Sequence, residues 1–145
     1  MFTNSQTFGS HKLSAMAYRD VGAVTALDGA SPHKLVSLLY EALATQIANA
    51  RGALTRHDLV EKGRAIGHAV RVLDEGLKTP LDLVAGGQLA ANLHSLYEYM
   101  VQRLTLANLR NDDAALFECA RLTETLREGW EGIAGEVHSA RRASA

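Results

Sequence analysis

The chain is organised around an apolar pattern that runs from Leu89 to Asn111. At about 100° per residue, the apolar side chains of this stretch cover an arc of roughly 220°, about twice the stripe that packs a helix onto a core from one side. The polar side is correspondingly narrow. Such a helix either lies deep in a bundle or offers part of its apolar surface to another molecule.

A second helix with surplus apolar surface is predicted from Ser31 to about Leu54. Ser31 is a suitable N-cap, and Pro32 follows it at the position where the missing amide of proline costs nothing. The apolar residues of this stretch cover about 200° of the helix, and only Gln46 interrupts them.

Two further helices carry simpler patterns. One begins after Asp58, keeps to a narrow apolar stripe and ends at about Lys78, because the following Thr79-Pro80 disfavours helix. It contains Gly63 and Gly67, where we expect the close approach of a neighbouring helix or a ligand, since glycine weakens a helix interior. The last helix, from about 113 to 137, has one stripe, and of its large apolar residues only Phe117 departs from it.

Four helices with short connections favour an all-α fold, an antiparallel up-down four-helix bundle with a mobile N-terminal arm. We assign residues 1–30 to the flexible arm, with a short capping helix near 15–24, residues 31–138 to the bundle, and residues 139–145 to a disordered tail. No strand pattern competes with this organisation.

Composition agrees with a single soluble domain: 145 residues, 47% hydrophobic and 21% charged. The net charge of −1 offers no general field for nucleic acid. The single Cys119 cannot form an internal disulfide, is expected in the core and suggests a reducing compartment. No apolar run is long enough to insert into a membrane, and the first residues do not form a secretory signal, so we expect a cytoplasmic protein.

Candidate chemistry is sparse. A di-metal bundle needs Glu-x-x-His pairs, and none occurs; His94 and Glu98 are best explained as a surface pair. A phosphorelay bundle needs an exposed helical histidine, but His57, the nearest histidine before Lys62-Gly63, falls in a connection. We therefore expect no catalytic residues, no metal, no cofactor and no enzymatic activity.

Several short motifs occur in order over about residues 15 to 137 and closely resemble the flagellar secretion chaperone family, FliS. They are Ala30-Ser31-Pro32-His33-Lys34-Leu35, Leu39-Tyr40 with Ala42, Lys62-Gly63, Gly86-Gly87, Asn92-Leu93, Leu96-Tyr97-Glu98-Tyr99-Met100, Arg103-Leu104, Ala107-Asn108, Asn111-Asp112, and Leu126 with Trp130.

The resemblance implies a non-enzymatic chaperone in the cytosol. Such a protein binds the disordered C-terminal segment of flagellin, prevents premature polymerisation and supports delivery to the flagellar type III export apparatus. Other flagellar export or regulatory proteins are further implied partners. Met16-Ala17-Tyr18 resembles the N-terminal segment of the family, whose tyrosine can lie over the client groove.

The surplus apolar surface of two helices suits an amphipathic client that binds as a helix in a groove. We predict a client-binding groove formed by Leu38, Tyr40, Ile47, Tyr97, Tyr99, Val101 and Leu106. Tyr18 and Val21 are expected to form a displaceable N-terminal lid. For each groove residue alone, ordinary core packing is the competing interpretation. Two other classes stay open on the residues themselves: a histidine phosphotransfer bundle, and a helical adaptor or dimerisation module.

Overall fold

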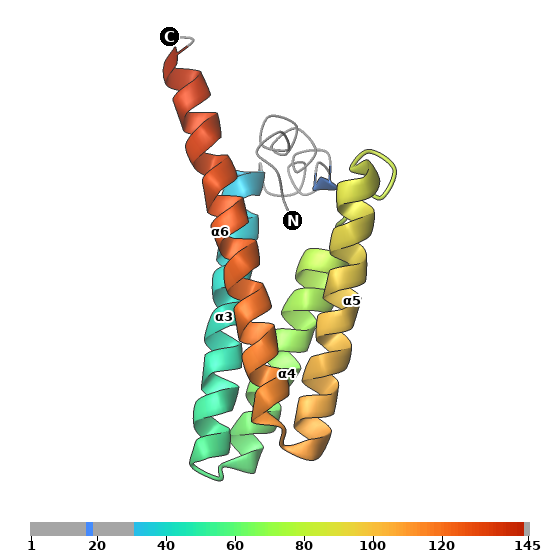
Figure 1. The fold of residues 1–145 in the computed structure, drawn as a ribbon, viewed down its shortest axis with the longest axis vertical. Coiled ribbons are helices and arrows are strands. Elements are labelled where there is room, and N and C mark those ends of the chain that lie inside the picture. Colours follow the sequence, from blue (N-terminus) through green and yellow to red (C-terminus); the bar gives the residue numbers. More distant parts are fainter. Residues whose placement is uncertain (1–16, 19–30, 144–145) are drawn as a thin grey trace.

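The computed structural model describes residues 17–18 and 31–143, and the backbone alone of residues 133–143. Within these ranges all regular structure is helical, and the helices form an elongated bundle (Figure 1). The predicted all-α four-helix fold is therefore confirmed. The rest of the expected arm, including Val21, lies outside the described residues.

The first helix of the bundle, α3, spans Pro32–Thr55 and begins as the sequence predicted. The side chain of Ser31 accepts a hydrogen bond from the backbone amide of Lys34 at 3.1 Å, and Pro32 lies in the first turn. Just after the helix, His57 adopts a left-handed conformation, with φ of 58°. This conformation reverses the chain into the next helix.

The second helical segment consists of α4, which spans Leu59–Arg71, and η2, which spans Val72–Lys78. Asp58 caps α4 as predicted, because its side chain accepts from the amide of Glu61 at 3.1 Å. The sequence predicted one helix of this extent. It did not predict that the last seven residues form a π-helix.

Local contacts account for the wide turns of η2. The carbonyl of Asp74 accepts from both the amide of Thr79 at 3.0 Å and its hydroxyl at 2.7 Å, which is the spacing of a π-helix. Pro80 then offers no amide to continue a helix. Gly76 faces α3 so closely that an added Cβ would lie 3.0 Å from Leu39, so the wide segment packs tightly against the first helix.

The third and fourth helices are α5, which spans Gly87–Arg110, and α6, which spans Asp113–Ala143. Asn111 turns the chain between them in a left-handed conformation, with φ of 52°. The buried amine of Lys62 reaches the end of α5, where it donates to the carbonyl of Asn108 at 3.0 Å and to the side chain of Asn111. A lysine at this position stabilises the C-terminus of α5, because it satisfies one of the last main-chain carbonyls and carries a positive charge there.

The last helix is longer than expected. It continues to Ala143, whereas the sequence suggested an end near residue 137 and a disordered tail from 139. Glycines reduce helix propensity in this region, but the chain contains no proline here, and the intervening alanine, glutamate and arginine residues favour helix.

Each helix packs mainly against its neighbours in the bundle. α3 lies against α4 and α6, and α5 lies against α6 and against α4 with η2. The connections at 56–58 and 111–112 lie together at one end (Figure 1). Residues 17–18 lie near the other end, beside the start of α5 (Figure 1). This second end contains the candidate site.

The close approaches occur at glycines other than the expected pair. An added Cβ at Gly67 would meet nothing within 4 Å, and one at Gly63 would lie 3.9 Å from Asn108, which is ordinary contact. The structure therefore does not show the expected close approach of a neighbouring helix at Gly63 or Gly67. A Cβ on Gly86 would lie 2.7 Å from the Cα of Ala17, so glycine is needed where the N-terminal segment crosses the bundle.

Candidate functional site

Tyr18 occupies the interior of the bundle at the end formed by the start of α5. It is only 2% exposed. Its hydroxyl donates to the carbonyl of Leu77 in η2 at 2.9 Å and lies 2.8 Å from the hydroxyl of Tyr97 in α5. Its ring meets Trp130 of α6 edge to face, with centroids 6.0 Å apart. The hydroxyl of Tyr40 in α3 lies 2.6 Å from that of Tyr97. One side chain from outside the bundle thus joins a cluster contributed by all four helical segments.

The three hydroxyl groups form a chain with a defined direction. Each phenol has a single proton to donate. Because Tyr18 uses its proton for a carbonyl, which can only accept, Tyr97 must donate to Tyr18. Tyr40 must then donate to Tyr97. The carbonyl of Leu77 therefore orients every hydroxyl in the cluster.

The pair Ala17-Tyr18 also completes the end of η2. The carbonyl of Leu77 is left without a backbone partner, because the amide of Leu81 closes a tighter turn and the amide of Asp82 donates to the carbonyl of Ala17 at 2.6 Å. Tyr18 supplies the missing donor. Tyr18 thus donates to the carbonyl of Leu77, and Ala17 accepts from the amide of Asp82. These two residues, which lie outside the four helices, satisfy main-chain groups at the end of η2.

Trp130 is fixed from the other side by His33 at the start of α3. The indole N–H donates to the carbonyl of His33 at 2.9 Å, and Nε2 of His33 donates to the carbonyl of Trp130 at 3.0 Å. The two rings stack with centroids 4.6 Å apart. This reciprocal clamp holds the tryptophan ring against Tyr18 and Tyr40.

Burial determines the electrostatics of the cluster. Removal from water raises the pKa of Tyr18, Tyr40 and Tyr97 well above the ordinary value for tyrosine, and the proximity of the three phenols raises it further. The phenols therefore stay neutral and act as hydrogen-bond donors and acceptors. Among the described side chains, every buried polar atom has a hydrogen-bond partner.

The structure brings together only some of the predicted groove residues. Tyr40 and Tyr97 meet in the cluster with the predicted lid residue Tyr18. Ile47 is fully buried in the core. Leu38 is 44% exposed, two positions from buried Tyr40 and therefore on the opposite side of α3.

The other three predicted groove residues lie along α5. Tyr99 is 42% exposed, and its hydroxyl donates to Glu118 of α6 at 2.6 Å. Val101 and Leu106 are half-buried. The seven residues therefore lie partly in the interior and partly on separate faces, and they do not line one continuous groove.

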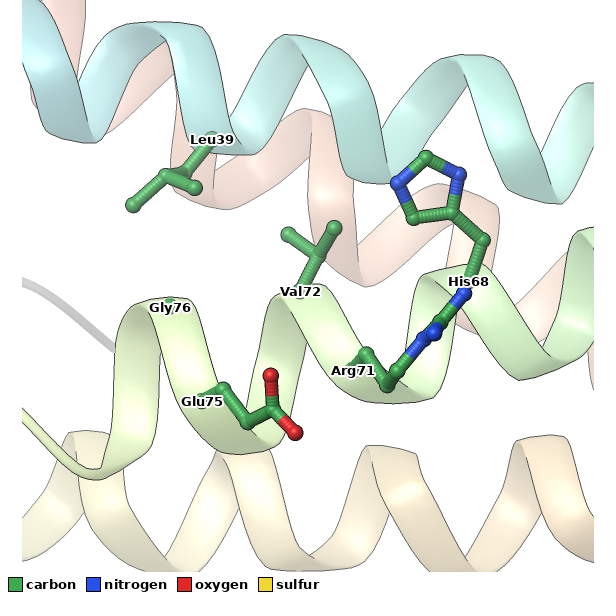
Figure 2. A pocket seen from close by; sticks show the side chains of 6 residues that line it. All are labelled: Leu39, His68, Arg71, Val72, Glu75 and Gly76. Carbon is green, nitrogen blue, oxygen red and sulfur yellow. The ribbon is translucent and has the colours of Figure 1, made fainter.

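A shallow depression between α3 and the segment formed by α4 and η2 is lined by none of them. It is lined by Leu39, His68, Arg71, Val72, Glu75 and Gly76 (Figure 2). Leu39 points from α3 toward Gly76, Val72 points from η2 toward α3, and polar side chains from α4 and η2 lie alongside (Figure 2).

Sequence reasoning missed several groups that build the cluster. Trp130 and His33 occurred in the quoted motifs, but nothing in the sequence indicated that they clamp each other. The carbonyl of Leu77 was not detectable, because its lack of a partner arises from the π-helix and the turn that follows. Gly86 did carry a signal, since it belongs to the Gly86-Gly87 motif.

The described ranges show no group of three or more His, Cys, Asp or Glu side chains that could hold a metal ion. Among the helices described here, none has the length and apolar character that crossing a membrane requires. Cys119 is fully buried, and burial raises the pKa of its thiol to about 12.

A four-helix bundle with a docked N-terminal tyrosine agrees with the class that the sequence motifs suggested, the flagellar secretion chaperones. The family model described as flagellar protein FliS matches residues 14–137. The FliS chaperone of Salmonella typhimurium is 41% identical over 117 residues, which cover 81% of this chain and 87% of that protein.

Two further relatives give the same result. The chain is 41% identical to the flagellar secretion chaperone FliSB of Pseudomonas aeruginosa, over 80% of this chain and 91% of that protein. It is 30% identical to the FliS chaperone of Vibrio cholerae, over 87% of this chain and 92% of that protein. The chain belongs to the FliS family.

Proposed function

We propose that this protein is an export chaperone that binds the disordered C-terminal region of flagellin in the cytosol. Binding masks the apolar surface through which flagellin subunits assemble, which prevents premature polymerisation. The chaperone then supports delivery of the client to the flagellar type III export apparatus. The family membership of the chain supports this role, since the relatives named above are flagellar secretion chaperones.

The observation that carries the proposal is the docking of Tyr18 inside the bundle. Its partners Leu77, Tyr97 and Trp130 belong to three different helical segments, and the tyrosine reaches them from outside the bundle. In this proposal the segment leaves while the helices stay folded, because Tyr18 belongs to none of them. Tyr18, together with Val21 as the sequence suggests, would then act as a lid, and its departure would expose Tyr40 and Tyr97 to the client.

The separate apolar residues that are exposed or half-buried suit a client that wraps around the bundle. Leu38 lies on α3, whereas Tyr99, Val101 and Leu106 lie along α5. A disordered segment can contact several faces in succession, and it loses conformational entropy as it becomes ordered. The contact area can therefore be large while the affinity stays moderate, which suits a chaperone that must release its client.

A titration with the C-terminal segment of flagellin from the same cell tests the proposal. Trp130 is the single tryptophan of the chain and lies against Tyr18, so its emission reports on the lid. We expect saturable binding, a red shift of tryptophan emission, and more helix by circular dichroism than the sum of the separate components. A peptide of the same composition in scrambled order is the control. Absence of binding would refute the client assignment.

Matched substitutions test the surface. Leu38→Ser and Tyr99→Ser should weaken client binding, because each removes exposed apolar area from a proposed contact. Val60→Ser is the control, since Val60 is 86% exposed on α4, away from these residues. If Leu38→Ser and Tyr99→Ser bind the flagellin segment as tightly as Val60→Ser does, Leu38 and Tyr99 are not part of the client-binding surface.

The lid is tested by Tyr18→Ala. Removing the anchor should increase client affinity, because the client no longer competes with the docked tyrosine. Protease cleavage of the N-terminal segment should also become faster. Unchanged affinity together with unchanged cleavage would contradict the lid while leaving client binding intact.

A further inference from the structure

The slot that holds Tyr18 has a definite hydrogen-bonding requirement. At its inner end, the carbonyl of Leu77 needs a hydrogen-bond donor. The hydroxyl of Tyr97 accepts from Tyr40, so its own proton needs an acceptor in the slot. The walls are aromatic, since Trp130 presents an edge-to-face contact to the bound ring. A phenol fits this requirement, because its hydroxyl donates one hydrogen bond and accepts another.

We propose that this slot is a binding site selective for a phenolic side chain that directly follows a small residue in a peptide. The inference goes beyond the proposed function, because it concerns the chemistry of the slot and holds whatever the client is. In the structure, the chain's own Ala17-Tyr18 occupies the site.

Other side chains meet the requirement less well. A phenylalanine fills the aromatic volume but leaves the carbonyl of Leu77 and the hydroxyl proton of Tyr97 unpaired in the interior, and an aliphatic side chain does the same. A carboxylate has no proton for the carbonyl, and an ammonium group cannot accept from Tyr97. Either charged group also loses its hydration in the buried slot.

The preference for a small preceding residue comes from backbone contacts. The carbonyl of Ala17 accepts from the amide of Asp82, which fixes the peptide beside Gly86. A Cβ added to Gly86 would lie 2.7 Å from the Cα of Ala17, and Ala17 itself has no exposed surface. A larger side chain before the tyrosine therefore has no space.

The site can be probed with small molecules in the full-length Tyr18→Ala variant, where the phenol ring is missing. The probe is p-cresol, and the control is toluene, which differs only by the hydroxyl group. Toluene is the more apolar of the two, so simple transfer from water favours toluene. Tighter binding of p-cresol would therefore report the two hydrogen bonds.

We expect p-cresol to bind Tyr18→Ala at least about tenfold more tightly than toluene, by calorimetry and by the shift in Trp130 emission. The wild-type chain, whose slot is filled, should show neither signal. The double variant Tyr18→Ala/Tyr97→Phe should lose most of the preference. Equal or tighter binding of toluene, or the same p-cresol response in the wild-type chain, would overturn the proposal.

A second variant tests the same requirement without creating a cavity. Tyr18→Phe keeps the ring and removes only the hydroxyl, so the segment should dock about tenfold less favourably. Trypsin cleavage after Arg19, followed by mass spectrometry, measures how often the segment is released. We expect cleavage about tenfold faster in Tyr18→Phe than in the wild-type chain and unchanged cleavage in Tyr99→Phe. A wild-type rate in Tyr18→Phe would overturn the proposal.

Discussion

The hydroxyl of Tyr40 donates a hydrogen bond of 2.6 Å to the hydroxyl of Tyr97, and this contact connects two helices that are not neighbours in the bundle. Tyr40 belongs to α3 and Tyr97 to α5, whereas the main packing partners of each are the helices between them. The contact therefore passes through the centre of the bundle. Tyr18 continues it to the carbonyl of Leu77, so three phenols and one carbonyl hold the end of the bundle together.

Substitution of the central phenol should be costly. Tyr97→Phe leaves the hydroxyl of Tyr18 without its donor and the hydroxyl of Tyr40 without its acceptor, both in the interior. We predict a loss of about 1–3 kcal/mol in the free energy of unfolding, measured by urea denaturation.

Tyr99→Phe is the matched control on the same helix. Tyr99 is partly exposed, and its hydroxyl donates to Glu118, which keeps the ion pair with Arg103. The free energy of unfolding should change by no more than about 0.5 kcal/mol. Equal losses in the two variants would show that the buried cluster contributes no more than a surface contact.

The buried phenols should make the bundle sensitive to alkali. In the unfolded chain a tyrosine loses its proton near pH 10, whereas burial raises the pKa of Tyr18, Tyr40 and Tyr97 in the folded chain. Above about pH 10 the unfolded chain therefore binds fewer protons than the folded chain. The free energy of unfolding should keep its full value below that pH. Above it, the free energy of unfolding should fall by about 1.4 kcal/mol per pH unit for each such tyrosine.

Urea midpoints measured on both sides of about pH 10 test this dependence. Tyr97→Phe is the control, because removing one buried phenol should make the dependence on pH less steep. Absorbance of tyrosinate should rise mainly with unfolding. Tyr99 is 42% exposed and can ionise in the folded chain, so a rise in tyrosinate absorbance that exceeds one tyrosine before any loss of helix would contradict the burial of the three phenols.

The helices were predictable because their signals are local. Ser31 and Asp58 cap the helices that the sequence assigned to them, and Thr79-Pro80 ends the second helical segment. Capping depends on residues a few positions apart, so it is visible in one sequence. The π-helix of η2 was not visible, because it depends on the packing of Leu39 against Gly76 and on two donors that share one carbonyl.

The candidate site was predictable only in part, because apolar periodicity does not distinguish a core residue from a groove residue. Tyr40 and Tyr97 belong to wide apolar arcs and were assigned to a groove, yet both are buried with Tyr18. The resemblance of Met16-Ala17-Tyr18 to the family's N-terminal segment identified the tyrosine, but not its partners. Its partner in η2 is a main-chain carbonyl, which no side-chain pattern reports.

Substitution of two glycines by alanine should change the free energy of unfolding in opposite directions. Gly67 lies exposed within α4, and an added Cβ would meet nothing within 4 Å, so Gly67→Ala should stabilise the protein by about 1 kcal/mol through helix propensity. Gly86→Ala should destabilise it, because the new Cβ would lie 2.7 Å from the Cα of Ala17.

Urea denaturation measures both effects, and trypsin cleavage after Arg19 measures release of the N-terminal segment. Cleavage should become faster in Gly86→Ala and stay at the wild-type rate in Gly67→Ala. A stabilised Gly86→Ala variant with slow cleavage would contradict the close crossing of Ala17 over Gly86.

Cys119 should be inert in the folded protein. The thiol is fully buried, and burial raises its pKa to about 12, with a smaller contribution from the charge of Glu118. At about pH 8 only about one thiol in ten thousand would then be ionised, and the thiolate is the form that reacts with disulfide reagents.

Labelling of Cys119 should therefore proceed at the rate at which the bundle opens, independent of reagent concentration once the reagent is in excess. The control is the same chain in denaturant, where labelling should be rapid and complete. Rapid labelling of the folded chain would contradict the burial of Cys119 between α5 and α6.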